Sequence, residues 1–362
     1  MTGIRDFQVV VLGSGPVGMV AALELSKHYR TALITSCLPS AELAPRVEAV
    51  PASLLALLVE YGIHPKQIGV DRLHETRLIS WEKEGFTESV GPVSAHVERP
   101  ALDLALLSAL VASKRVNIIL GQQSETFSKA LAAARNHKVR LIDATGRRSL
   151  SAKKKIQPAR PWAARTLFTS RRSCSGSQEF RICALPGGFV FRLGAADYIV
   201  LGIVGRGKTV AGNPHELDHL LHEYGAAWIL EGLPRVAEMT QGGISPASVQ
   251  WTIGDAGTRI GDAALARDTL SSQGLACGIS EALYAAAIRD DEGGNLFSLR
   301  QFEQRTSHLR ALSGLIARCR CRDEVAWREY AAFISGHLLD ENPVSSVALR
   351  TGQLQRLSAH HY

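Results

Sequence analysis

The feature that most constrains the fold of this 362-residue chain is a glycine pattern near its N-terminus. Residues 8–12 form a short apolar run that predicts a strand buried on both faces of a parallel sheet. Gly13, Gly15 and Gly18 follow with G-x-G-x-x-G spacing, and residues 15–28 have the apolar periodicity of a helix. Because a helix N-terminus attracts phosphate, a strand, a glycine turn and a helix in this order predict a dinucleotide site.

Each glycine of this turn has its own expected role. The first makes the turn, the second lets the backbone approach a pyrophosphate, and the third lets the helix pack on the strand. Pro16 and Val17 lie between them and belong to the predicted binding site. The second strand is predicted at 31–35, and an acidic residue at its end would bind the hydroxyls of the adenosine ribose. Thr35 and Ser36 stand there instead, so this residue is missing. We therefore expect ribose contacts that are weaker or that come from elsewhere.

Composition predicts an ordered chain with a basic segment. The hydrophobic content of 46% allows a large core, and a prior of roughly 150 residues per domain gives about two domains. The net charge of +7 favours an anionic ligand or partner. The stretch from Lys138 to Arg172 carries eleven basic residues and one acid, which predicts either a solvated loop or a docking surface for an acidic partner. Aromatic residues are few in this stretch, so nucleic acid is the weaker option.

Cysteine usage and the N-terminal apolar stretch predict a cytoplasmic protein. The six cysteines form no C-x-x-C pair, as is typical of a reduced compartment. Cys319 and Cys321 flank one arginine without further ligands nearby, so no metal site is expected. The apolar stretch 8–25 contains three glycines and a proline and lacks a basic leader, which disfavours a signal peptide and a membrane span.

The whole chain predicts an α/β architecture with a discontinuous, Rossmann-like nucleotide-binding domain. Further helices are predicted at 52–61, 100–113, 216–230 and 272–288, helical structure at 297–338, strands at 116–120 and 139–143, and an antiparallel sheet within 158–251. The expected domains are 1–61, 96–157 and 252–296 for the nucleotide, 62–95 and 158–251 for the substrate, and 297–362 as a C-terminal helical region.

Two later segments complete the predicted cofactor site. Asp143 and Gly146 follow a strand, where the chain could close over a dinucleotide, although a plain Asp-Gly turn fits equally well. Residues 261–274 contain a Gly-Asp pair and a small-residue turn that opens a helix. This turn and the N-terminal glycine turn could both bind phosphate, and they lie far apart in the sequence. Together they predict one long cofactor that is held at both ends.

These motifs, in this order, resemble those of FAD-dependent enzymes with the para-hydroxybenzoate hydroxylase fold. The likeness is to the branch that contains tryptophan halogenases and the flavoproteins of tryptophylquinone maturation. Residues 45–55 resemble its R-x-G-E-x-L-P-P helix start, and residues 97–103 resemble its flavin-contacting arginine segment. Residues 268–274 read Asp-Thr-Leu-Ser-Ser-Gln-Gly where relatives have Asp-Pro-Leu-Ser-Ser-Gln-Gly, so Thr269 is a departure that could loosen this turn.

The resemblance implies which residues would contact FAD. Arg46 and Arg99 would lie beside the flavin, unless they form ordinary surface ion pairs. The Gly261-Asp262 pair would supply a carboxylate to the ribityl hydroxyls. The helix that begins near Ser272, Gln273 and Gly274 would stabilise negative charge on the reduced flavin through its dipole.

The closest likeness within the branch implies hydroxylation of a tryptophan in a partner polypeptide, through a flavin C4a-hydroperoxide, during biogenesis of a quinone such as cysteine tryptophylquinone. Asp268 and Glu48 are candidate general acids or bases, and either can instead be structural. Electrons could come from NAD(P)H or from a separate flavin reductase. Three tryptophans could wall an aromatic pocket or belong to the core: Trp162, Trp228 and Trp251.

Other activities stay open at the sequence level. Halogenases of this branch need a W-x-W-x-I-P element and a lysine, whereas residues 189–193 of this chain read Phe-Val-Phe-Arg-Leu, so halogenation of tryptophan is disfavoured. A hydroxylase, halogenase or reductase of a small aromatic or lipid substrate is an alternative. A flavin-bearing maturation partner without catalysis is another.

Overall fold

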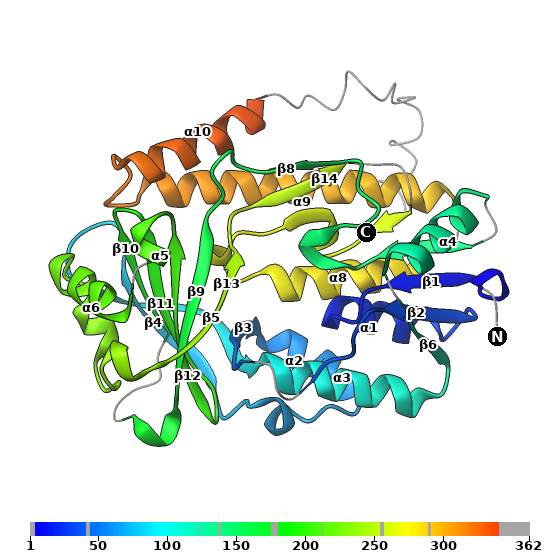
Figure 1. The fold of residues 1–362 in the computed structure, drawn as a ribbon, viewed down its shortest axis with the longest axis horizontal. Coiled ribbons are helices and arrows are strands. Elements are labelled where there is room, and N and C mark those ends of the chain that lie inside the picture. Colours follow the sequence, from blue (N-terminus) through cyan, green and yellow to red (C-terminus); the bar gives the residue numbers. More distant parts are fainter. Residues whose placement is uncertain are drawn as a thin grey trace, which may run out of the picture.

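A parallel sheet with the predicted glycine turn at its centre forms one half of the fold (Figure 1). The computed structural model describes residues 4–40, 44–121, 123–136, 139–174, 180–211, 213–253, 257–288 and 291–339. The sheet has the order β15-β7-β1-β2-β6, and its neighbouring strands are all parallel. Its strands are β1 (Val9–Leu12), β2 (Thr31–Thr35), β6 (Val116–Leu120), β7 (Arg140–Asp143) and β15 (Thr258–Arg259).

Helices cover both faces of this sheet, which explains why β1 is apolar throughout. Val9 and Val11 pack with α1 (Pro16–Leu25), α3 (Arg99–Ser113) and α8 (Gly274–Ala287). Val10 and Leu12 face the opposite way and pack with α4 (Gln123–Arg135), a helix that the sequence pattern did not predict. The predicted doubly covered Rossmann-like sheet is therefore confirmed.

A larger, mainly antiparallel sheet forms the other half, with the order β13-β9-β12-β11-β10-β4-β5-β3. Only β10 and β4 pair in parallel. Its strands are β3 (Val47–Pro51), β4 (Leu73–Ser80), β5 (Thr87–Glu98), β9 (Ala163–Ser170), β10 (Phe180–Leu185), β11 (Gly188–Gly194), β12 (Tyr198–Gly205) and β13 (Thr240–Pro246). β3 and β5 lead directly into α2 (Ala52–Glu60) and α3, so this sheet reaches the parallel half at its β3 edge.

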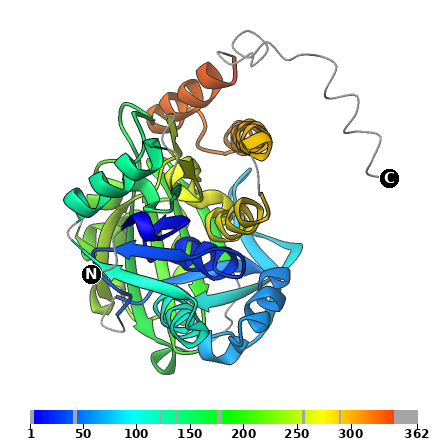
Figure 2. The ribbon, with the colours of Figure 1, turned by 90° about the vertical axis from the view of Figure 1, so that its right-hand side faces the viewer.

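Each face of the larger sheet has its own cover. Helix α6 (Pro214–Glu223) packs on one face with an aliphatic cluster. On the other face, aromatic residues pack with α9 (Asp291–Ala317) and α10 (Val325–Leu339), which are joined by residues 318–324. In both views α9 runs beside α8, so it extends along both halves of the molecule (Figures 1 and 2). The remaining elements are α5 (Lys208–Ala211), α7 (Asp262–Leu265), and the small sheet of β8 (Lys154–Ile156) and β14 (Gln250–Ile253).

Several predicted helices differ from the observed ones, among them the helix expected at 15–28, which spans Pro16–Leu25. The helix expected at 216–230 ends at Glu223, because Gly225 adopts a left-handed conformation with φ of 63° and only a short turn follows. The helical stretch expected at 297–338 is divided between α9 and α10. The helix expected from residue 272 begins at Gly274, because Ser272 has φ of 48°. No helix in the ranges given above is long and apolar enough to span a membrane.

The docking of α10 depends on Trp327, and its removal tests this part of the fold. Trp327 is fully buried, its Nε1 donates to Leu185 O at 2.8 Å, and its ring lies edge-on to Trp81 and Trp162. We expect Trp327→Ala to lower the free energy of unfolding by about 3–5 kcal/mol, as measured by urea denaturation. The exposed Val325 of the same helix is the control. Val325→Ala should change the free energy of unfolding by less than about 0.5 kcal/mol. A loss under about 1 kcal/mol for Trp327→Ala would contradict this packing.

Candidate functional site

The glycines of the N-terminal turn differ in the space around them. Gly13 has φ of 101°, and a Cβ there would lie 2.6 Å from Ala144 O, so this position requires glycine. A Cβ on Gly18 would collide with Gly13 O in the turn itself. Gly15 is different, because a Cβ there would meet nothing closer than Arg99 Nη2, at 3.9 Å. The open space lies at the one glycine whose expected role is close approach to a pyrophosphate.

The helix that follows the turn begins without a side-chain cap. Gly15 is the N-cap of α1, and Pro16 and Val17 are its first residues. The first-turn N–H groups of such a helix lack partners within the helix and can bind an anion. In place of an acidic residue at the end of β2, Ser14 Oγ lies 2.8 Å from Thr35 Oγ1 and also from Cys37 O. The turn and the loop after β2 are thus tied together by neutral groups.

The two segments predicted to bind the cofactor, the N-terminal glycine turn and residues 261–274, are in contact. A Cβ on Gly261 would lie 3.2 Å from Val17 Cγ1, and a Cβ on Gly278 would lie 2.6 Å from Val17 Cγ2. Segments about 240 residues apart in the sequence therefore meet at the start of α1. Gly274, the first residue of α8, has Asp262 Oδ1 as the nearest neighbour of its added Cβ, at 3.8 Å.

A buried glutamate holds the Gly261-Asp262 pair. Glu281 of α8 accepts from Gly261 N at 2.7 Å and pairs with Arg267 at 3.4 Å. Burial raises the pKa of Glu281, although Arg267 opposes this. The sequence prediction missed Glu281, yet an acidic residue within an Ala-rich apolar helix was a usable signal. Asp262 is half-buried, and burial raises its pKa against the influence of Arg147, whose Nε is 3.9 Å away.

Arg99 forms an ion-pair cluster beside Gly15. It binds Glu48 at 2.7 Å and Asp103 at 2.8 Å, while Arg46 lies 3.2 Å from the same Glu48 oxygen. Burial would raise the pKa of Glu48, but Arg99 and Arg46 outweigh it and lower the pKa below its ordinary value. Glu48 is therefore ionised at neutral pH and orients the two arginines. Its catalytic role stays a prediction, and a proton-donating role does not suit this environment.

Asp143 shapes the loop after β7. Its carboxylate accepts from the backbone N and the hydroxyl of Thr145, and from the same two groups of Ser151. Gly146 lies within this loop with φ of 63° and open space around it. These four hydrogen bonds use the carboxylate structurally, so a direct cofactor contact by Asp143 stays a prediction.

Asp268 is also bound within the protein. It is buried, its Oδ1 accepts from Leu270 N at 2.7 Å, and its Oδ2 accepts from Tyr330 Oη at 2.6 Å. Burial raises the pKa of Asp268, while the hydrogen bond from Tyr330 opposes this. Asp268 therefore caps and positions the turn that carries residues 271–273. A catalytic role for Asp268 stays a prediction.

A cavity of about 970 Å³ lies between the larger sheet and helices α8 and α9. β3, β4, β5 and β10 form one wall, and the turn at 271–273 with the two helices forms the other. Ser272 and Gln273, which belong to the predicted flavin segment, therefore line this cavity as well. Its other lining residues include Trp81, Phe180, Leu312, His96, His308 and Arg267. A mainly apolar cavity with a few polar groups is the usual form of a ligand site.

The three tryptophans named as candidate pocket walls do not line this cavity. Trp162 and Trp251 are buried in the aromatic core, and Trp228 lies 4.9 Å from Phe86, ring to ring. Trp81 lines the cavity instead. It lies between β4 and β5, in a region where the sequence predicted no strands, so only the tertiary fold reveals its place.

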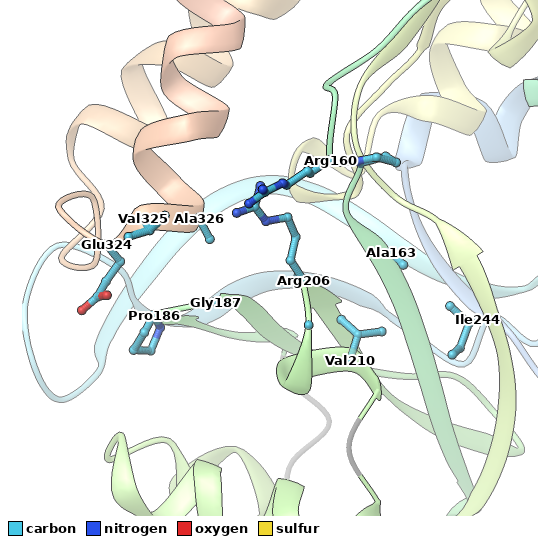
Figure 3. A pocket seen from close by; sticks show the side chains of 13 residues that line it. Arg160, Ala163, Pro186, Gly187, Arg206, Val210, Ile244, Glu324, Val325 and Ala326 are labelled. Carbon is cyan, nitrogen blue, oxygen red and sulfur yellow. The ribbon is translucent and has the colours of Figure 1, made fainter.

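A second cavity, of about 760 Å³, contains none of the predicted site residues (Figure 3). It lies between the end of the larger sheet and the start of α10, and Arg160 and Arg206 point toward each other in it. Both arginines pair with Glu329. Their charge is thus partly neutralised within the protein.

Part of the basic segment binds internal loops. Arg140 donates to the carbonyls of Ala285 and Ile288 at the end of α8, and Arg147 donates to those of Ser248 and Arg267. Lys138 lies outside the described residues. Several of these charges thus support internal loops. Within the described ranges, no group of three or more His, Cys, Asp or Glu residues is placed to hold a metal ion.

Comparison with known proteins finds similarity in structure but not in sequence. No protein-family model matches the chain, and no curated protein matches it. Among solved structures, the peptidyl tryptophan dihydroxylase QhpG, essential for tryptophylquinone cofactor biogenesis, matches with a TM-score of 0.66 and 18% identity. The match covers 90% of this chain and 78% of QhpG. The myxobacterial chondrochloren halogenase CndH matches with a TM-score of 0.67 and 15% identity, over 94% of this chain and 92% of CndH.

A third structure is PqsL, a probable FAD-dependent monooxygenase from Pseudomonas aeruginosa. It matches with a TM-score of 0.62 and 12% identity, over 91% of this chain and 99% of PqsL. The fold is that of FAD-dependent halogenases and monooxygenases. Since hydroxylases and halogenases share it, the fold alone does not select the reaction.

The capping role of Asp268 predicts how its variants behave. Asp268→Asn keeps an oxygen for Leu270 N, but its NH2 group faces Tyr330 Oη, whose proton loses its acceptor, so we expect it to lower the free energy of unfolding by about 1 kcal/mol, less than Asp268→Ala does. Asp268→Ala leaves both groups without their partner and should cost about 1–3 kcal/mol. Urea denaturation at neutral pH measures both values. Equal losses for the two variants would contradict the capping role, because the bond to Leu270 N that asparagine retains would then contribute nothing.

Proposed function

We propose that this chain is an FAD-dependent monooxygenase that hydroxylates a tryptophan side chain of a partner polypeptide, as a step in the biogenesis of a tryptophan-derived quinone. One observation carries the proposal. The apolar cavity of about 970 Å³ is lined by Ser272 and Gln273, which also belong to the segment expected to face the flavin. A substrate in this cavity would therefore lie beside the reactive end of the cofactor.

The residues present fit FAD. Space that a side chain would fill lies open at Gly15, beside the uncapped start of α1 and the guanidinium of Arg99. Asp262 and the start of α8 lie at the other end, in contact with α1 through Val17. Bound and reduced FAD would supply the two electrons with which dioxygen gives one oxygen atom to the substrate and the other to water. The proposed contacts are Gly13, Gly15, Pro16, Val17, Gly18, Arg46, Arg99, Asp143, Gly146, Gly261, Asp262, Ser272, Gln273 and Gly274.

The protein's own residues would then orient both reactants. Glu48 and Asp103 hold Arg99 at the Gly15 end, and Glu281 fixes the Gly261-Asp262 pair at the other. Trp81 and Phe180 offer aromatic surface to a ring in the cavity. Asp268 positions the turn between cofactor and substrate through its hydrogen bonds to Leu270 and Tyr330. Such preorganisation accelerates a reaction because the reactants no longer lose orientational freedom at the barrier.

Two observations support tryptophan hydroxylation over halogenation. Residues 268–274 resemble the turn of flavoproteins that hydroxylate a tryptophan in a partner polypeptide. No lysine is among the described residues that line the cavity, whereas tryptophan halogenases depend on one. A small aromatic substrate is the second candidate, because the cavity volume also lies within the range of small-molecule pockets.

Labelled oxygen tests the proposed reaction. The full chain is loaded with FAD, reduced with dithionite so that no reductase is needed, and mixed with oxygen-18 gas and tryptophan-containing peptides that have acidic or neutral flanks. We expect mass spectrometry to show one or two labelled oxygen atoms on the tryptophan of at least one peptide. Gly15→Val is the matched control, because it should fold but leave no room for FAD.

Two results would count against the proposal in different ways. Labelled free indole or phenol with unlabelled peptides would favour the small-molecule candidate. Flavin that binds and reoxidises without labelling any peptide or small aromatic would contradict the monooxygenase assignment itself. Electron donors are tested separately, by following NADH and NADPH oxidation with and without an added flavin reductase.

A further inference from the structure

The cavity contains a buried histidine with one unsatisfied ring nitrogen. His96 lies on β5, exposes 1% of its surface and lines the cavity. Its Nδ1 is 2.7 Å from Gly194 O, whereas its Nε2 has no hydrogen-bond partner among the described residues. A buried polar atom without a hydrogen-bond partner destabilises the fold by about 1–3 kcal/mol. Because Nε2 lies beside a cavity, a bound ligand is the natural supplier of that partner.

The contact with Gly194 defines what that ligand must provide. A carbonyl oxygen only accepts hydrogen bonds, so Nδ1 carries the proton and donates it to Gly194 O. In the neutral ring, Nε2 is then a bare acceptor. Burial and the stacked ring of His74, 4.0 Å away, lower the pKa of His96 to about 3, so the ring stays neutral at physiological pH. Arg77 acts in the same direction, while the Gly194 carbonyl and Asp71 oppose it.

The register of β3 and β5 places His96 on the side of this sheet edge that faces the cavity. His96 pairs with Ala49, and the adjacent Val97 pairs with Glu48, which binds Arg99. Ala49 and Pro51 of β3 line the same cavity. Because successive side chains of a strand point to opposite faces, His96 shares its face with Ala49 and Pro51, whereas Glu48 and Val97 point to the other face. A ring bound to His96 would lie between this edge of the sheet and the turn at 271–273.

We infer that His96 Nε2 accepts the ring N–H of an indole bound in this cavity. The inference rests on the proposed function and deepens it by naming the group of the substrate that is recognised. The hydrogen bond selects an aromatic ring that carries an N–H over a ring of the same size that lacks one. It also fixes which edge of the indole faces β5, while Trp81 and Phe180 contact the apolar part of the ring.

Binding of two matched probes tests the inference. N-acetyl-L-tryptophanamide carries the N–H, and N-acetyl-3-(3-benzothienyl)-L-alaninamide has a similar shape with sulfur in its place. Isothermal titration of the full chain, with and without FAD, gives the ratio of their dissociation constants. We expect the His96→Phe variant to shift this ratio by about tenfold against the tryptophan probe, the effect of one hydrogen bond. His96→Gln, whose side-chain oxygen can accept, should restore part of the preference.

His74→Phe is the control, because it keeps a ring in the stack and does not line the cavity. It should leave the ratio unchanged. A ratio that differs by less than about twofold between wild type and His96→Phe would overturn the inference, as would failure of the tryptophan probe to bind the wild type. These measurements need neither reduction nor oxygen, so their failure is distinguishable from a failure to hydroxylate.

Discussion

The close packing of α1 against α8 is the constraint on which the rest of the site depends. Val17 fits against Gly261 and Gly278, and a Cβ on Gly278 would lie 2.6 Å from the valine side chain and 3.2 Å from Gly261 Cα. Only residues without side chains allow the two helices to approach this closely. The approach brings the glycine turn after β1 next to the Gly261-Asp262 pair, so two loops become the two ends of one site.

Charged side chains then hold the pieces in place. Glu281 links the backbone of Gly261 to Arg267, and Glu48 links Arg46 to Arg99 across the edge where the two sheets meet. Asp143 and Asp268 each support one loop beside these clusters. Most of the carboxylates at the site thus position other groups. The cavity retains a neutral acceptor, His96, and apolar walls, which suit recognition of an uncharged aromatic ring.

The sequence predicted the parts whose signals are local. The turn at Gly13–Gly18 is recognisable because Gly13 and Gly18 have steric reasons and Gly15 leaves space open, and strand β1 is recognisable because it is apolar on both faces. The cavity could not be predicted, since its residues gather through long-range pairing. Trp81 Nε1 donates to Leu315 O, 234 positions away, and His96 meets Gly194 across 98 positions. Helix boundaries such as Glu223 shifted for a local reason, because Gly225 ends the helix where the apolar pattern continues.

Ligand competition at the two ends of the site tests the central claim that one FAD spans both. FAD, AMP and FMN are titrated against the wild type, Gly15→Val and Asp262→Ala, with flavin fluorescence as the readout for FAD and FMN and displacement of FAD for AMP. We expect both substitutions to weaken FAD, Gly15→Val to weaken both half-ligands because each carries one phosphate of the pyrophosphate, and Asp262→Ala to weaken FMN alone. FAD affinity that is unaffected by either substitution would contradict the claim.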